Sequence, residues 1–535
     1  MVSSRREFLK KIGQAGILCC VPSLSRAAGF FPDTVCVSIL HTTDLHGHIL
    51  PTVDYDGNPN LGGLARCVTQ IRRWRKQNPN SILIDVGDVY QGTDLGLRSK
   101  GELMIDLFNY LKYDAWVVGN HEFDWGLAPF LRSVEKSTMP VLAANALLEE
   151  KNAGEIYESG NPLSKIRPYI LKKIAGIKIA IIGVTTPGLP FWFRPEFIRG
   201  FDVQYPVEPV RRAIVRAKSE GANAIVVAGH MGLKTHTGGD DFANNVTSLT
   251  SEFQDVAVFI AGHTHQLIAS RMMNGVLVTQ ADHFGIHAGR VDLYFNRETK
   301  RLVLREAHCE LMDKRFRIDP VVVSRIRTQL DESHAALGQP IGELAETLRV
   351  RAQPGVPSEV ERIIGAATME MLRDRGTTVD GAFHGLFDEK NNAMAGRKTV
   401  DDVWNIIPFE NYIVTASLLP EEIKMVMDEV YITRDRRSLL GFDVQTTGSG
   451  TERRIASITL DDGRPLEREK RYTIAFNSFD SRSAGHRFMK LRELLETPAV
   501  DCRLHDVQTR DALIEYFRRH KIVHRIPTHK LREAA

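Results

Sequence analysis

The sequence predicts an α/β protein in which layered sheets and helices form a first domain and a smaller, mixed α+β domain follows. Three observations predict this arrangement. Short apolar runs, typical of strands buried on both faces, recur along the first part of the chain. Amphipathic stretches of helical length separate several of these runs. The pattern then changes near residue 318. The chain of 535 residues is long enough for two or three domains with their own cores.

Charge and hydropathy limit the classes of partner. The sequence has 69 basic and 66 acidic residues, a net charge of +3, which predicts no general attraction to nucleic acids or anionic membranes. No apolar run approaches the roughly 20 residues that a transmembrane helix needs. We therefore expect no nucleic-acid partner and no membrane anchor, and we expect a monomer that acts on a small molecule.

The N-terminus has the pattern of an export signal. The stretch "SSRREFLKK" contains the pair Arg5 and Arg6, and the weakly apolar "IGQAGILCCVPSLS" follows it. Ser25 and Ala27 are small residues suited to peptidase cleavage. Residues 1–28 thus resemble a twin-arginine signal peptide, which implies a periplasmic or secreted protein. The alternative is a basic amphipathic N-terminal helix.

In the first domain, residues 29–317, seven apolar runs predict buried strands. Two stretches between them, "GGLARCVTQIRRWRKQ" and "EPVRRAIVRAKSEGA", have helical spacing. From "VLVTQADHFGIHAGRVDLYFN" to "RLVLREAHCEL" the pattern changes to alternating strands and hairpins. The seven runs are "VCVSIL", "SILIDVG", "DAWVVG", "PVLAANAL", "KIAIIGVT", "AIVVAGH" and "VAVFIAGH".

A helix at residues 318–338 is expected to link the two domains. In "DPVVVSRIRTQLDESHAAL", Asp319 is the cap and Pro320 takes the first helical position. The second domain, residues 339–525, mixes helices such as "PSEVERIIGAATMEML" with short strands, and a tail of residues 526–535 ends the chain. The cysteines outside the predicted signal are widely spaced and form no CxxC pair, so neither a zinc ribbon nor a dense disulfide framework is expected.

Five predicted strands end in side chains that bind metals. At four of these ends a glycine directly precedes the first polar residue, which allows the backbone to turn tightly. In open α/β sheets, ligands gather at the carboxyl ends of the strands, so we expect these side chains to converge on one cleft. The candidate ligands are Asp44, His46, Asp88, Asn120, His230, His263 and His265.

Three carboxylate or amide oxygens and four imidazoles suit two divalent first-row ions, such as zinc or manganese. The Asp88 carboxylate can bridge both ions. Two ions about 3.5–4 Å apart can hold a hydroxide as nucleophile and bind the oxygens of a phosphoryl group. Each motif alone has an ordinary alternative: Asp44 and His46 as turn residues, and "GHTH" as a surface cluster. Five such strand ends in series favour the metal.

His121 and Asp124 are the candidate catalytic residues. In "VVGNHEFDWG", His121 follows the candidate ligand Asn120 and would lie near the ions without binding them. It could then act as an acid or stabilise charge in the transition state, with Asp124 fixing its ring. The alternative is that Asn120 starts a turn and His121 is an ordinary surface residue.

These residues carry a resemblance. The order D-x-H, GDxxxG, GNHE, GH, GHxH resembles the calcineurin-like metallophosphoesterases, and "HTTDLHGH", "GNHEFDWG" and "AGHTHQ" resemble the 5′-nucleotidase and UDP-sugar hydrolase family. The resemblance covers nearly all of the chain after the predicted signal. It implies a four-layer α/β/β/α metallophosphoesterase domain, a linking helix and a C-terminal substrate-specificity domain. It also assigns the seven side chains as ligands of two divalent ions, and His121 with Asp124 as the catalytic dyad.

The second domain resembles the family less closely. "KTVDDVWNIIPFENYIV" is similar to the family's "PFGN" segment, and "YTIAFNSFDSRSAGHRF" to the partner segment, so Phe409 and Phe479 are candidate rings for stacking on a base. Core packing is the alternative for both. The family's Asn-Gly-Gly-Gly-x-Arg stretch reads "VDGAFHGLFDEKNN" here, without arginine, and Gly-Gly-Asp-Gly reads "AGHR". Because arginine is the usual grip on phosphate, nucleotide specificity is left open, with Arg349, Arg351 and Arg487 as candidate substitutes.

We therefore predict an exported dinuclear-metal phosphoesterase that hydrolyses nucleotides or related phosphate esters. One alternative is a related hydrolase of UDP-sugars, 2′,3′-cyclic nucleotides or another small anion. Thiosulfohydrolases share the architecture, but that family replaces the "GNHE" histidine context, which is intact here. The other alternative is a non-catalytic periplasmic binding protein. The complete ligand set and the pair His121 and Asp124 favour a working enzyme.

Overall fold

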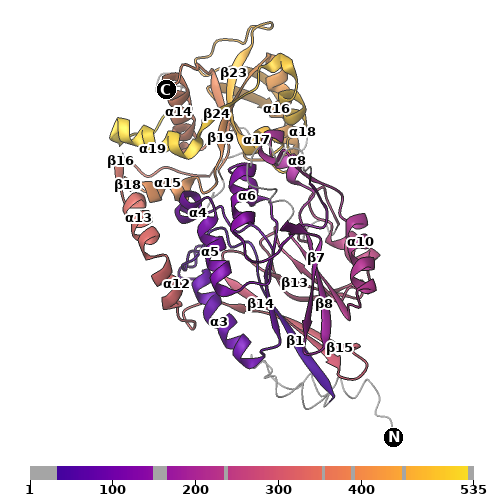
Figure 1. Ribbon diagram of the computed structural model, residues 1–535. Coiled ribbons are helices and arrows are strands. Elements are labelled where there is room, and N and C mark those ends of the chain that lie inside the picture. The colour runs from indigo at the N-terminus through magenta and orange to yellow at the C-terminus, as the bar shows by residue number, and fades with distance from the viewer. Residues whose placement is uncertain are drawn as a thin grey trace, which may run out of the picture.

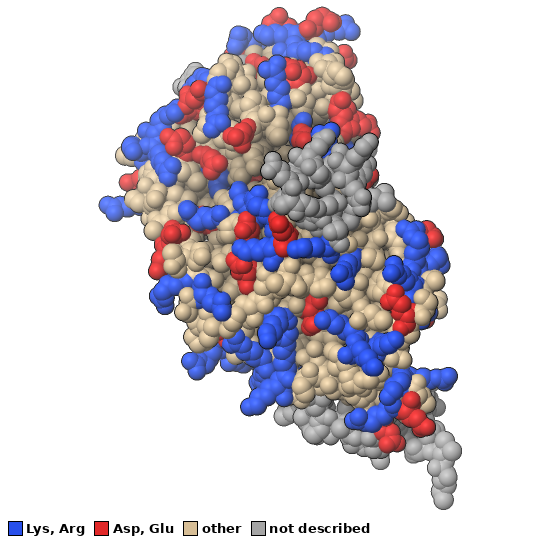
Figure 2. All heavy atoms as spheres, viewed as in Figure 1, with Lys and Arg blue, Asp and Glu red and all other residues tan. Residues whose placement is uncertain are grey.

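Figure 1 shows a larger first domain and a smaller second domain, joined by helices at one side of the molecule. Acidic and basic side chains both occur across the face in Figure 2, in keeping with the small net charge. Among the helices that the structure describes, none is long and apolar enough to cross a membrane. The predicted export signal lies outside the described residues. The computed structural model describes residues 33–148, 165–233, 239–351, 356–386, 392–448 and 453–527.

Two sheets pack against each other in the first domain. The first has the strand order β15-β14-β1-β2-β3-β4-β6, and the second has the order β12-β13-β11-β10-β8-β7. Strands β1, β2 and β3 are parallel, as are β8, β10 and β11, so their carboxyl ends meet at common edges. The first sheet comprises β1 (Thr34–Thr42), β2 (Ser81–Asp85), β3 (Ala115–Val117), β4 (Val141–Leu142), β6 (Ile166–Arg167), β14 (His287–Asn296) and β15 (Leu302–Leu311). The second comprises β7 (Tyr169–Ile174), β8 (Ile177–Val184), β10 (Ala224–Gly229), β11 (Val258–Ala261), β12 (Leu267–Met273) and β13 (Val276–Ala281).

Helices cover the outer face of each sheet. One buried cluster lies between the two sheets and joins residues such as Val37 and Ile84 of the first to Val226 of the second. A second cluster lies between the first sheet and its helices, and a third lies between the second sheet and its helices. This order of layers confirms the four-layer α/β/β/α fold that the resemblance implies. The covering helices include α3 (Leu64–Gln77), α5 (Glu102–Leu111) and α6 (Leu127–Lys136) on the first sheet, and α10 (Val207–Ser219) and α11 (Val246–Glu252) on the second.

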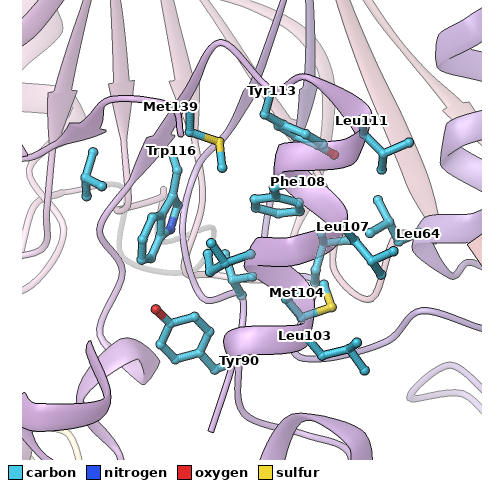
Figure 3. Close-up of a cluster of buried hydrophobic side chains, with 14 of the residues drawn as sticks. Leu64, Tyr90, Leu103, Met104, Leu107, Phe108, Leu111, Tyr113, Trp116 and Met139 are labelled. Atoms are coloured by element: carbon cyan, nitrogen blue, oxygen red, sulfur yellow. The ribbon is translucent and has the colours of Figure 1, made fainter. Parts of the chain in front are cut away.

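Helix α5 illustrates how the sequence pattern forms a layer. Its apolar residues recur every three or four positions and therefore share one face of the helix. Figure 3 shows Leu103, Leu107 and Phe108 on this helix, near Tyr113 and Trp116. The Phe108 and Tyr113 rings stack with centroids 4.1 Å apart. Burial of this face holds α5 against the first sheet.

The linker differs from the single helix expected at 318–338. It forms α12 (Pro320–Arg325) and α13 (Arg327–Leu337), with a break at Ile326, where φ is −107° and ψ is 9°. Asp319 caps α12 as expected, because its side chain accepts from the N–H groups of Val321 and Val322. Val322 and Ile326 are both buried in the core of the first domain, whereas α13 is mostly exposed. Packing of Ile326 at the break thus divides the expected helix.

The second domain is built on a sheet with the order β20-β17-β23-β19-β24. Helices α14 and α19 pack together on one buried cluster, and α16 and α18 belong to another. The four described cysteines are free, in keeping with their spacing. The main elements are α14 (Glu359–Asp374), β17 (Gly381–His384), α15 (Val400–Ile406), β19 (Tyr412–Leu418), α16 (Pro420–Thr433), β20 (Ser438–Leu440), β23 (Tyr472–Asn477), α17 (Ser478–Ser481), α18 (Met489–Leu495), β24 (Arg503–Gln508) and α19 (Thr509–His520). A smaller sheet includes β16 (Pro340–Leu344) and β18 (Gly396–Thr399).

Candidate metal centre

The seven candidate ligands follow strands of both sheets and meet at one edge. Strands β1, β2 and β3 of the first sheet and β10 and β11 of the second each end within a few residues of a candidate. Carboxylate and imidazole atoms come within 4.8 Å of one another in two groups that share one residue. The first group is Asp44, His46, Asp88 and His265, and the second is Asp88, His230 and His263.

Asp88 is the residue that both groups share. Its Oδ2 lies 3.1 Å from Nε2 of His230 and 3.7 Å from Nε2 of His46, one histidine of each group. Its Oδ1 accepts a hydrogen bond of 2.8 Å from the backbone N–H of His121. Oδ1 of Asn120 lies 3.2 Å from the same Nε2 of His230, so the amide also faces this cluster. One buried carboxylate between two groups of donors has the placement of a bridging ligand.

The other ring nitrogen of two candidate ligands is held by the backbone. Nδ1 of His46 lies 2.7 Å from the carbonyl oxygen of Gln91, and Nδ1 of His230 lies 2.7 Å from that of Val86. A carbonyl partner keeps the proton on Nδ1, so that Nε2 is left to bind a cation. The Nε2 atoms face the cluster, and those of His46 and His265 are 3.0 Å apart.

The charge states of the candidate ligands differ: burial leaves two imidazoles neutral, whereas the Asp88 carboxylate outweighs burial and raises the pKa of His230 to about 9. Burial lowers the pKa of His46 and of His263 to about 3, which leaves the neutral imidazole that can bind a metal. Burial, with the nearby Asp88 charge, raises the pKa of Asp44 to about 7 despite the opposing effect of His230. Nδ1 of His263 is buried and has no hydrogen-bond partner in the described part of the chain. Burial of two carboxylates is costly unless cations neutralise them. Burial of a ring nitrogen without a partner is costly unless the nitrogen binds a cation.

The backbone of the cluster is strained in a way that functional sites share. Five of the seven candidate ligands have left-handed φ angles, which non-glycine residues seldom adopt. Such conformations cost on the order of 1–3 kcal/mol each and are retained where the surrounding structure enforces them. The five are Asp44 (51°), His46 (48°), Asp88 (56°), His263 (69°) and His265 (51°).

His121 lies beside the two groups and belongs to neither. Its Nδ1 is 2.7 Å from Oδ2 of Asp124, and its ring centroid is 5.1 Å from that of His46. Burial alone would lower the pKa of His121, but the Asp124 and Asp88 carboxylates outweigh burial and raise it to about 10. A protonated imidazole at this position can donate a hydrogen bond or a proton to a developing negative charge.

Glu122 organises the site but was not among the predicted residues. It is fully buried and accepts hydrogen bonds from the backbone N–H groups of Gly119 and Val89 at 2.7 Å and of Asp88 at 3.2 Å. It thereby ties the loop after β2 to the loop after β3. Its signal in the sequence is its place as the last residue of "GNHE".

Two aromatic residues that the sequence does not predict as site residues also contact candidate ligands. The Tyr55 hydroxyl lies 2.8 Å from Nδ1 of His265. The Trp192 ring, in α8 (Leu189–Trp192), lies with its centroid 5.0 Å from that of His263. Neither residue stands in a recognisable motif, because each reaches the site from a separate segment through tertiary packing.

The second domain brings the ring of Phe409 beside His121. The Phe409 ring lies with its centroid 6.2 Å from that of His121, and the planes differ by 18°. Phe479, in α17, packs against the core of the second domain. It also lies near Gly485, where an added Cβ would be 3.8 Å from the ring. The structure therefore places Phe409 beside His121 and Phe479 against the core of the second domain.

The three arginines proposed as substitutes have different surroundings. Arg349 is paired with Glu359 at 2.6 Å, and Arg487 with Asp435 at 3.0 Å. Arg351 is exposed. Both ion pairs lie within the second domain.

Comparisons with known protein families cover both domains. Residues 37–267 match the family described as calcineurin-like phosphoesterase, and residues 340–493 match the 5′-nucleotidase C-terminal domain. The first match includes all seven candidate ligands together with His121 and Asp124. The second includes Phe409 and Phe479.

The chain is similar to several characterised proteins over part of their length. It is 23% identical over 501 residues to the endonuclease YhcR of Bacillus subtilis, which corresponds to 88% of this chain and 39% of that protein. It is 29% identical over 321 residues to a snake venom 5′-nucleotidase of Naja atra, or 55% of this chain and 57% of the relative. The chain thus spans less than two thirds of either relative.

A solved structure confirms the fold. The 5′-nucleotidase precursor of Thermus thermophilus superposes with a TM-score of 0.69 at 22% identity. The superposition covers 92% of this chain and 98% of that structure, so both domains have counterparts in it.

Proposed function

Because the chain belongs to the calcineurin-like phosphoesterases that carry a 5′-nucleotidase C-terminal domain, we propose that it is a dinuclear-metal hydrolase of phosphoric esters with nucleotides as its preferred substrates. The observation that carries the proposal is the position of Asp88, shared by two groups of candidate ligands. Two divalent ions, when bound, would polarise phosphoryl oxygens and lower the pKa of water.

The ligands divide between the two ions according to their grouping. Asp44, His46 and His265 would hold one ion, and Asn120, His230 and His263 would hold the other. Asp88 would serve both. The carbonyl partners of His46 and His230 support this division, because they orient Nε2 of each ring toward the cluster.

We assign His121 the role of stabilising charge on the phosphoryl group or protonating the leaving oxygen. Its side chain is 26% exposed, so a substrate can reach it, and Asp124 occupies Nδ1 and leaves Nε2 for the substrate. Asp124 thus fixes the ring and favours its protonated form.

Phe409 is proposed to bind the flat part of the substrate. Its ring comes from the second domain and lies beside His121, so a base bound there would be next to the reacting phosphate. We propose Phe479 as a second ring of the same binding region. Both assignments favour a nucleotide over a simple phosphate monoester.

Hydrolysis of phosphodiesters or sugar nucleotides is the second candidate. The relative that matches 88% of this chain is named an endonuclease, and an endonuclease cleaves phosphodiesters. A non-catalytic binding protein has less support, because a hydrogen-bonded histidine and carboxylate beside the cluster serve no purpose in binding metal alone.

A hydrolysis panel tests the proposed function. The metal-loaded protein would be assayed with AMP, UDP-glucose, a 2′,3′-cyclic nucleotide and an aryl phosphate, and with the His121→Ala variant as control. We expect phosphate release from AMP at the highest kcat/KM, and loss of activity in the control. Preferred cleavage of the cyclic nucleotide or UDP-glucose would select the second candidate. No hydrolysis of any ester would contradict the proposal.

A further inference from the structure

Gln91 connects the candidate metal centre to the second domain. It lies in the loop after β2, three residues beyond Asp88, and its side chain is fully buried. Its backbone carbonyl holds Nδ1 of His46 at 2.7 Å. Its side-chain Nε2 donates a hydrogen bond of 3.2 Å to the carbonyl oxygen of Pro408 in the second domain. One residue therefore contacts a candidate ligand and a loop of the other domain.

The loop that Gln91 holds carries the ring beside the catalytic histidine. Pro408 directly precedes Phe409, whose ring lies near that of His121. Two residues after Pro408, Glu410 forms a buried ion pair of 2.9 Å with Arg510 of α19. The loop is thus held by an ion pair within its own domain and by a hydrogen bond from Gln91 of the first domain. A change at Gln91 would act on the position of Phe409.

The net stabilisation from this contact is small. Oε1 of Gln91 is buried without a hydrogen-bond partner in the part of the chain that the structure describes. The cost of such an unpaired acceptor is comparable to the net gain from one hydrogen bond. Flipping the amide would set Oε1 against the Pro408 carbonyl, so the orientation with Nε2 donating is the favourable one.

A different part of the domain interface has more contacts that hold the two domains together. Arg482 donates a hydrogen bond of 2.9 Å to the carbonyl oxygen of Pro190, in α8. The His486 ring stacks on Phe242, with centroids 4.8 Å apart. Charged and aromatic contacts here attach the second domain, so loss of the Gln91 contact need not separate the domains.

We propose that Gln91 is a positioning residue that holds Phe409 against the catalytic histidine while it orients the candidate ligand His46. The side chain performs the first role and the backbone carbonyl performs the second. The role of Phe409 rests on the proposed function, and the position of its loop does not. The two can therefore be tested separately.

The variant Gln91→Met tests the side chain alone, since it keeps similar volume and the backbone carbonyl. Gln70→Met is the matched control, because Gln70 on α3 is also buried with an unpaired Oε1 among the described residues. In the metal-loaded protein, amide hydrogen exchange of residues 409–412 should be roughly 2- to 10-fold faster in Gln91→Met. Metal content should be unchanged, and the control should match the wild-type protein.

Kinetics then test positioning against a general structural role. We expect Gln91→Met to lower kcat/KM for AMP roughly 2- to 10-fold, and to have no further effect in a Phe409→Ala background. Unchanged exchange at residues 409–412, equal effects of Gln70→Met, or independent effects of the two substitutions would each overturn the proposal. If the wild-type protein hydrolyses no ester, the proposed function fails and the exchange experiment still decides the role of Gln91.

Discussion

The backbone N–H of His121 donates a hydrogen bond of 2.8 Å to Oδ1 of Asp88. This bond joins the proposed acid to the proposed bridging ligand through the main chain, while Asp124 occupies Nδ1 of the His121 ring and leaves Nε2 for a substrate. The carboxylate that would hold two ions thus also fixes the main chain of the proposed catalytic histidine. Because the bond uses the main chain of His121, a substitution of its side chain keeps the bond and should separate metal binding from chemistry.

Asp88→Ala should be the most damaging single change among the ligands. It removes a ligand from both ions and the acceptor of the His121 N–H, so kcat should fall by more than roughly 10³-fold, the scale for dismantling a catalytic unit. Elemental analysis should show loss of metal. Asp106→Ala is the control, because that side chain is half exposed and lies outside the cluster. An Asp88→Ala protein with a full metal complement would contradict the bridging role.

His121→Ala should keep both ions and lose rate. Neither group of candidate ligands includes this ring, so metal content and substrate affinity should stay close to wild type. The kcat should fall by roughly 10²–10⁴-fold, the range for loss of a positioned acid–base group. Steady-state kinetics together with elemental analysis of the same sample make the measurement.

The neighbouring Asn120→Ala supplies the contrast. Its amide oxygen faces His230, so its loss should weaken one ion site, and added metal should partly restore the rate. Reversed behaviour, with metal lost from His121→Ala and retained by Asn120→Ala, would exchange the two assignments. Full activity in both variants would mean that this loop is only a turn.

The convergence of the seven candidate ligands could be predicted because their signal is local. Each follows an apolar run, four strand ends have a preceding glycine, and parallel strands bring such ends to one edge. The layers followed from the same alternation of strands and helices. The break at Ile326 could not be predicted, because helical spacing continues through it and burial against the first domain decides the geometry.

The supporting residues could not be predicted for a related reason. Glu122, Tyr55 and Gln91 act through contacts between loops that are distant in sequence or buried by tertiary packing. No spacing rule identifies such contacts. The sequence does not show which of Phe409 and Phe479 lies beside His121, because both are apolar residues of segments that resemble the family. In the structure, Phe409 lies there.

Glu361 should make the stability of the second domain depend on pH. It caps α14 by accepting from the Ser358 N–H at 2.6 Å, and burial raises its pKa from the ordinary 4.5 to about 7. A raised pKa means that its contribution is fully present below about pH 4.5 and is lost as the pH rises through about 7. Glu361→Gln keeps an acceptor for Ser358 and cannot ionise.

Urea unfolding at pH 5 and pH 8.5 measures this effect. At pH 8.5 the variant should be more stable than the wild-type protein, by up to on the order of 3 kcal/mol, and the difference should shrink toward pH 5. The unfolding transition of the second domain should be followed by itself, because two domains need not unfold together. A difference that is independent of pH would contradict the assignment.

Export is testable through the N-terminal pair of arginines. We propose that residues 1–28 direct the protein through a twin-arginine route, which carries folded proteins. Replacing Arg5 and Arg6 with lysine should leave unprocessed precursor in the cytoplasm, as detected by fractionation and immunoblotting. Normal processing of this variant would indicate another route.

The central claim is that the shared carboxylate of Asp88 organises a two-ion hydrolytic centre. Titration of metal-free protein with a divalent ion, with bound metal and AMP hydrolysis followed in the same samples, tests it most directly. We predict that activity appears in step with occupancy, reaches its maximum at close to two ions per chain, and disappears with chelator. Full activity without bound metal, or a plateau at one ion per chain, would contradict the claim.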